Sequence, residues 1–144
     1  MSKKGITFLE ILIVLFISLL FLIPITIFIQ KYHRSYLLNT SCAKITEGIN
    51  FARECAINER CNFFVVFEEK SFKILKEGKN IIWKEIKLPE DVIIKEKTSG
   101  MDPLIFLPDG TSSQAGHIVL IDGISKKEKK IKVYNITGKC LIEE

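Results

Sequence analysis

The stretch KKGITFLEILIVLFISLLFLIPITIFI, residues 3–29, decides the fold of this 144-residue chain. Between residues 11 and 29, only one serine, one proline and one threonine are not plainly apolar. As a helix these nineteen residues would be about 28 Å long, which is close to the thickness of a bilayer core. The stretch therefore predicts one membrane-spanning helix near the N-terminus.

A single carboxylate, Glu10, lies at the start of this apolar stretch. An acidic residue costs about 2.5–3.5 kcal/mol at the centre of a membrane helix, and such residues usually have a partner. A secretory signal peptide would have a shorter apolar core and a small-x-small cleavage site, which the far end PITIFIQKYHRSY lacks. A plain signal anchor, with Lys3 and Lys4 on the cytoplasmic side, fits the length but explains Glu10 only if it snorkels to the interface.

The run KKGITFLE resembles the class III leader of type IV prepilins and type II secretion pseudopilins. In that family a short basic leader ends in glycine, a prepilin peptidase cuts after it, and glutamate is the fifth mature residue. The resemblance implies cleavage between Gly5 and Ile6, N-methylation of Ile6, and Glu10 at the fifth mature position. The family usually begins the mature chain with Phe or Met, and Ile6 departs from this mildly.

The new N-terminus gives Glu10 a partner. Cleavage creates an α-amino group at Ile6, which is positively charged near neutral pH. In the family, the glutamate of one subunit is thought to meet the amine of a neighbouring subunit. In a low dielectric this attraction offsets part of the desolvation cost, and a misplaced subunit leaves the carboxylate unpaired. We therefore expect Glu10 to set the registry of assembly.

The hydrophobic period then changes along the chain. Apolar residues spaced four, three, four, three and four apart predict that the helix continues as an amphipathic one: Leu38, Cys42, Ile45, Ile49, Ala52 and Ala56. From Asn62 onward, short runs rich in Ile, Val and Phe are separated by Gly, Pro, Asp or Asn, which predicts seven or eight mostly antiparallel strands. The predicted fold class is α+β, with a long N-terminal helix packed on a β head, as in pilins. The expected parts are a leader (1–5), a membrane-spanning half-helix (6–30), an amphipathic half-helix (31–60) and a β-rich head (61–144).

Three stretches of the head, FARECAINERCNFFVVF, LIFLPDGTSS and VYNITGKCLI, resemble the GspH/FimT group of pilin-like proteins. The matching residues are Arg53, Ala56, Ile57, Phe106, Pro108, Gly110, Thr111, Gly138 and Lys139. The resemblance implies a minor pseudopilin of a type II secretion system or a minor pilin of a type IV pilus. Such a subunit has no active site of its own, and it helps to start or cap a filament with other subunits and the assembly machinery. It would be a single-pass protein of the inner (cytoplasmic) membrane, with its head in the periplasm or outside the cell.

Charge does not by itself indicate nucleic-acid binding. The net charge is +4, and it falls to +2 if the leader with Lys3 and Lys4 is removed. One local cluster, SKKEKKIK, carries Lys126, Lys127, Lys129, Lys130 and Lys132 at a predicted hairpin, where a charge run is usually solvated. Some FimT-like pilins bind DNA during natural transformation through basic residues toward the C-terminus, so contact with DNA or a partner here is an alternative function. A third alternative is an unprocessed, membrane-anchored β-domain.

The four cysteines are Cys42, Cys55, Cys61 and Cys140. They form no CxxC pair and have no histidine at ligand spacing, so no metal site is predicted. Cys140 on the last strand is a candidate to bridge to Cys61 or to Cys55, and the alternative is buried, reduced thiols. The sequence also lacks GxSxG, a P-loop and paired histidines, so we predict no enzyme and no cofactor.

Overall fold

The computed structural model describes residues 7–78 and 82–143, apart from the side chains of residues 22–25. Gly5 and Ile6, the predicted cleavage site, lie outside the described residues. The chain divides into two units, residues 1–35 and residues 36–144, and each is described by itself. The described elements are α1 (Phe8–Glu59), β1 (Phe63–Phe67), β2 (Ser71–Lys76), β3 (Ile82–Lys87), β4 (Val92–Lys97), β5 (Leu104–Phe106), β6 (Gly116–Asp122), β7 (Glu128–Val133) and β8 (Cys140–Glu143).

The first unit consists of the beginning of α1. Its side chains from Phe8 to Phe21 are exposed. An 18-residue window of the helix has a mean hydropathy of 3.1, so the helix is long and apolar enough to cross a membrane. This apolar helix fits the single-pass anchor that the sequence predicts.

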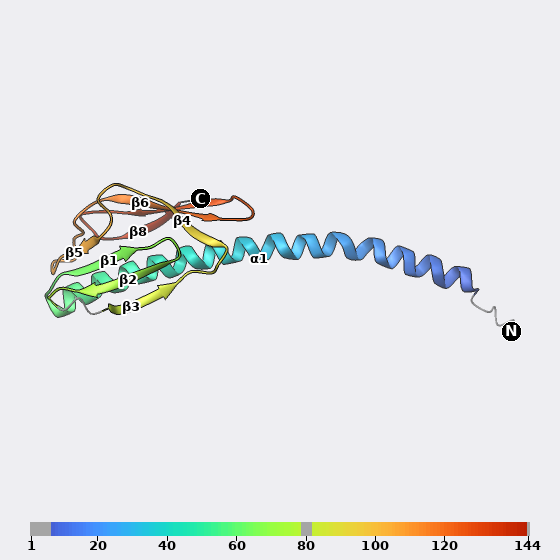
Figure 1. The fold of residues 1–144 in the computed structure, drawn as a ribbon, viewed down its shortest axis with the longest axis horizontal. Helices are drawn as coiled ribbons and strands as arrows, with labels where there is room; N and C mark the ends of the chain where they lie inside the picture. The colour runs from blue at the N-terminus through green and yellow to red at the C-terminus, as the bar shows by residue number, and fades with distance from the viewer. Residues whose placement is uncertain (1–6, 79–81, 144) are drawn as a thin grey trace. The chain divides into compact units, whose positions relative to one another are not determined.

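In the second unit, the later part of α1 forms one side of the core. All six residues of the predicted apolar stripe, Leu38, Cys42, Ile45, Ile49, Ala52 and Ala56, are buried. Gly48 on the same helix lets β2 approach closely, because a Cβ at this position would lie 2.3 Å from Cε2 of Phe72. Figure 1 shows β1, β2 and β3 alongside this part of α1. The predicted packing of a long helix on a β head is confirmed.

Eight antiparallel strands form two four-stranded sheets in the described part of the chain. The strand orders are β3-β2-β1-β5 and β4-β6-β7-β8. Alternate residues of β1 are fully or almost fully buried, as expected for strands with one face on the core: Phe63, Val65 and Phe67. Leu120 of β6 and Ile131 of β7 bring the second sheet into the same core cluster. The predicted number and direction of the strands are confirmed.

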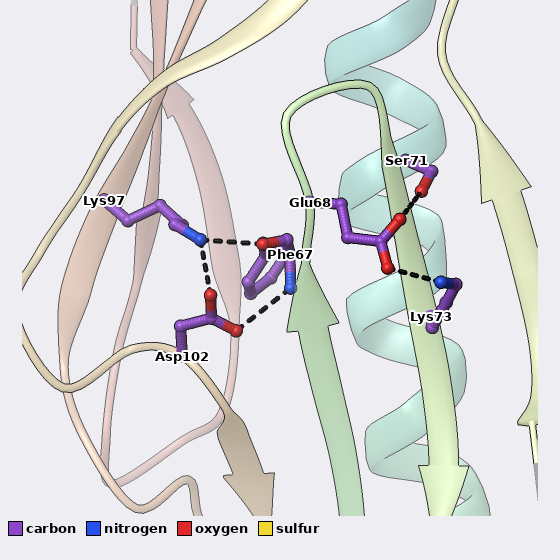
Figure 2. A network of polar contacts seen from close by, with 6 residues as sticks. All are labelled: Phe67, Glu68, Ser71, Lys73, Lys97 and Asp102. Carbon is purple, nitrogen blue, oxygen red and sulfur yellow. Dashed lines mark hydrogen bonds and ion pairs between the residues drawn. The ribbon is translucent and has the colours of Figure 1, made fainter.

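A polar network joins the two sheets, as Figure 2 shows. The carboxylate of Asp102 accepts a hydrogen bond from the backbone N–H of Phe67 (3.1 Å) and another from the ammonium of Lys97. Lys97 of β4 also donates to the carbonyl oxygen of Phe67 at 2.7 Å. Nearby, the N–H of Ile94 donates to the carbonyl of Glu69 at 2.9 Å. These bonds position β4 against the turn between β1 and β2.

The same turn carries a second set of contacts, also drawn in Figure 2. Glu68 accepts a hydrogen bond from the hydroxyl of Ser71 at 2.7 Å and pairs with the ammonium of Lys73. These two bonds hold the pKa of Glu68 below its ordinary value, and the bond from Lys73 has the larger effect. The carboxylate therefore stays ionised at neutral pH and fixes the turn.

Candidate functional site

Three motifs that are far apart in the sequence meet at one point of the second unit, which we call the Arg53 junction: Arg53, Gly110 and Gly138. The Nε–H of Arg53 on α1 donates to the carbonyl oxygen of Gly110 at 2.9 Å. Gly110 has φ of 82° and Gly138 has φ of 59°, which are left-handed values that favour glycine. The resemblance had grouped these residues as family motifs, and the structure brings them into contact.

Gly110 and Gly138 have neighbouring atoms so close that a larger side chain would not fit at either position. A Cβ on Gly138 would lie 2.5 Å from the carbonyl oxygen of Gly110 and 2.8 Å from Cδ of Arg53. A Cβ on Gly110 would lie 2.8 Å from Cδ1 of Ile57. Asp109 stabilises the turn that contains Gly110. Its carboxylate accepts hydrogen bonds from the N–H (2.9 Å) and the hydroxyl (2.7 Å) of Thr111. The Arg53 junction is therefore a tightly packed contact between α1, this turn and the residues that directly precede β8.

Glu10 lies in the first turn of α1, in the first unit. Its backbone N–H donates to the side-chain oxygen of Thr7 at 3.3 Å and to the carbonyl oxygen of Thr7 at 3.0 Å. Thr7 thus caps the helix, and Thr-x-x-Glu is the pattern of a capping box. A carboxylate in the first turn also interacts favourably with the helix dipole. Thr7 is missing from the predicted site residues, although its spacing from Glu10 before an apolar run signals such a cap.

The lysine-rich hairpin does not present its five lysines on one face. Lys126 and Lys127 are exposed in the turn between β6 and β7. Lys129 lies on the same face of β7 as the buried Ile131. Burial raises the pKa of Cys42 on α1, and the charge of Lys129 opposes part of that rise. Lys130 and Lys132 lie on the opposite face. Strand alternation therefore divides the cluster.

Acidic residues of β7 and β8 also offset part of this positive charge. The ammonium of Lys132 lies 2.5 Å from Oε1 of Glu143 on β8. The pKa of Glu143 is lowered mainly by that hydrogen bond and further by the charge of Lys130. Glu128 of β7 itself lies 2.5 Å from the ammonium of Lys95 on β4, the strand on the far side of β6. The outward face of β7 therefore carries both charges, with Glu128 beside Lys130 and Lys132, and is no purely basic stripe.

The four cysteines are free thiols in the structure, and a bridge between Cys61 and Cys140 stays a prediction. Cys140 lies near Arg53, whose charge partly opposes the effect of burial on its pKa. Cys61 instead follows α1 and lies near Cys55, whose pKa is raised first by burial and then by Glu59, Glu54 and Cys61. Different neighbours surround the two thiols, and the sequence could not show this.

Burial predicts that two of these thiols react slowly. It raises the pKa of Cys42 to about 11 and that of Cys140 to about 12. At pH 8 both therefore remain protonated, although a higher pKa also makes each remaining thiolate more nucleophilic. We expect iodoacetamide to alkylate them roughly 10- to 100-fold more slowly in the folded chain than in the unfolded chain.

The measurement is peptide mapping by mass spectrometry after timed alkylation, with the chain in guanidinium chloride as the control. The rates should rise as the pH approaches 11, because only the thiolate reacts. Equal rates in the folded and unfolded chain would show that the thiols are not shielded.

No group of three or more His, Cys, Asp or Glu side chains that could hold a metal ion occurs among the residues that the structure describes. The candidate features are separate ones. The first unit has a capped apolar helix with one carboxylate, and the second unit has the Arg53 junction and the divided lysine cluster.

No protein-family model and no curated protein matches this sequence. Solved structures do match. The type IV minor pilin FimU of Pseudomonas aeruginosa is 12% identical, with a TM-score of 0.64 over 78% of this chain and 92% of that chain. The minor pseudopilin EpsH from the type 2 secretion system of Vibrio cholerae is 13% identical, with a TM-score of 0.60 over 74% of this chain and 95% of that chain. The chain therefore has the pilin-like α+β fold of these minor pilins and pseudopilins.

Proposed function

We propose that this chain is a minor pilin or pseudopilin that assembles with other subunits into a filament, after cleavage between Gly5 and Ile6 by a prepilin peptidase. One observation carries the proposal: on a pilin-like fold, an exposed apolar helix begins at Phe8, three residues after the end of KKG in the sequence, with a carboxylate in its first turn. In an ordinary anchor, that carboxylate would serve only the start of the helix. In this function Ile6 is the N-methylated N-terminus, and Glu10 pairs with the α-amine of a neighbouring subunit.

The role is non-enzymatic, and the anchor would lie in the inner membrane with the head on its outer side. FimU belongs to a type IV pilus and EpsH to a type 2 secretion system, so both kinds of machine fit this fold. DNA uptake is the less supported function, because the lysine cluster is divided between two faces and partly paired with acidic residues. The proposal is therefore a filament subunit, with partners among pilin-like proteins and the assembly machinery.

The deciding experiment is the intact mass of the chain extracted from membranes of cells that have a prepilin peptidase. We expect the loss of residues 1–5 and the gain of one methyl group on Ile6. Gly5→Leu should remain at full length, because a bulky side chain at the cleavage site blocks the peptidase. Ser2→Leu is the matched control within the leader and should be processed normally.

Two results would contradict the proposal. An uncut wild-type chain would make this an anchored β-domain, in which Glu10 would serve only the start of α1. Processing of Gly5→Leu at the normal rate would show that cleavage does not depend on the class III leader.

A further inference from the structure

A hollow of about 570 Å³ lies beside the Arg53 junction, between α1 and the β7–β8 hairpin. We call it the β8 hollow, and its lining residues are Asn50, Arg53, Tyr134, Thr137, Lys139, Cys140 and Leu141. Its volume falls in the range of ligand pockets, roughly 300–1,000 Å³. All of these residues belong to the second unit, and the functions considered above do not use the hollow.

The hollow offers positive charge in a fixed position. Its lining includes Arg53 and Lys139 and no acidic residue. Within the described part of the chain, the Arg53 side chain makes one hydrogen bond, from its Nε–H to the carbonyl oxygen of Gly110. The two terminal amino groups of its guanidinium therefore remain available to a ligand. A guanidinium binds a carboxylate or a phosphate through two parallel hydrogen bonds. The charges therefore favour an anionic group.

Strand β8 adds an unpaired sheet edge next to this charge. Among the described strands β8 pairs only with β7. The N–H of Tyr134 donates to the carbonyl of Lys139 at 2.9 Å, and the register continues with Leu141 opposite Lys132. Because hydrogen-bonded pairs alternate along antiparallel strands, Cys140 and Ile142 direct their backbone N–H and C=O groups away from β7. Such an edge can bind an extended peptide segment by adding it as a further strand.

The rim of the hollow is apolar. Tyr134 is 43% exposed and Leu141 is 56% exposed, although both are large hydrophobic residues. Ile136, in the connection between β7 and β8, is 86% exposed. Exposed apolar groups that gather next to a hollow are typical of protein-binding surfaces. A nucleic-acid backbone would match neither this rim nor the backbone hydrogen bonds of the β8 edge.

We propose that the β8 hollow binds an extended segment of a partner protein, in which a Glu or Asp side chain is flanked by apolar residues. The segment pairs with the free edge of β8, and its carboxylate binds Arg53 and Lys139. The flanking apolar side chains pack on Tyr134 and Leu141. This binding goes beyond the proposed filament function and does not depend on cleavage after Gly5.

The test uses the full chain in detergent micelles and a defined probe. The probe is a capped, fluorescein-labelled pentapeptide of alternating valine and threonine with glutamate at its centre, and its partner probe has glutamine there. We expect fluorescence anisotropy to show that the glutamate peptide binds at least about tenfold more tightly than the glutamine peptide. The reason is that hydrogen bonds between charged groups are stronger than those between neutral groups. Equal affinity for the two peptides, or no binding of either, would overturn the proposal.

Variants on the exposed rim keep the test independent of folding. Lys139→Gln and Leu141→Glu should each weaken binding of the glutamate peptide severalfold, whereas Lys126→Gln, the same charge change in the β6–β7 turn, should not. Arg53→Gln should abolish the preference for glutamate, provided that Trp83 fluorescence shows a folded head. A single-stranded DNA oligonucleotide that displaces the peptide and binds more tightly would assign the hollow to nucleic acid and overturn the proposal. Loss of binding in Lys126→Gln as large as in Lys139→Gln would also overturn it.

Discussion

Replacing Gly138 with alanine is expected to lower the free energy of unfolding of the head by about 3 kcal/mol. Two costs add up at this position. The backbone has φ of 59°, a left-handed conformation that costs a residue with a Cβ about 1 kcal/mol relative to glycine. The new Cβ would also lie 2.5 Å from the carbonyl oxygen of Gly110, which is a backbone atom. This carbonyl cannot move away freely, because it accepts the hydrogen bond from Arg53.

Gly78 provides a matched control for the backbone term alone. It has φ of 84°, and a Cβ on it would have no heavy atom within 4 Å. Gly78→Ala should therefore cost only about 1 kcal/mol, and the difference between the two variants measures the packing of the Arg53 junction. The measurement is denaturant unfolding of the full chain in detergent, followed by the fluorescence of Trp83, the single tryptophan.

Trp83 is a suitable reporter because its ring packs edge-on against Phe63, with 6.0 Å between the ring centroids. Equal losses for Gly138→Ala and Gly78→Ala would contradict the prediction. That result would mean that the junction relaxes around a methyl group and that only backbone strain is felt.

The regular elements could be predicted because their signals are local. The apolar stripe from Leu38 to Ala56 follows from the helical period, and the strands follow from short apolar runs between turn residues. The length and composition of the N-terminal apolar stretch are enough to predict a helix that fits a membrane anchor. For these elements the hydrophobic pattern and the tertiary packing agree.

The contacts of the site could not be predicted, because they depend on which strands become neighbours. Nothing in the sequence places Gly110 beside Gly138, or Asp102 beside Phe67, since 28 and 35 residues respectively separate them. The lysine cluster is an intermediate case. Its division follows from strand alternation once β7 is placed, whereas the pairing with Glu143 depends on β8 being the next strand.

The second large effect is expected at Glu10, whose structure allows two explanations. Thr7 accepts a hydrogen bond from the backbone N–H of Glu10, and in the matching capping-box pattern the Glu10 side chain would help to begin α1. As a charge, the same side chain would pair with the α-amine of a neighbouring subunit. Glutamine also serves at the third position of a capping box, but it has no charge. Glu10→Gln therefore removes the charge and keeps the helix start, and Thr7→Ala removes the cap and keeps the charge.

In the proposed filament, Glu10→Gln should lower the amount of assembled subunit at least about tenfold, because the amine would be left without a counter-charge in a low dielectric. Thr7→Ala should assemble nearly as well as the wild type, since an N-cap contributes only about 1 kcal/mol to a helix that is also stabilised by its apolar surroundings. The measurement is the fraction of mature chain that co-sediments with filaments, after the intact mass has shown that each variant is cleaved. Assembly of Glu10→Gln at the wild-type level would remove the pairing role. A loss in Thr7→Ala as large as in Glu10→Gln would show that assembly depends on the start of α1 as much as on the charge, and it would contradict a registry role specific to the Glu10 carboxylate.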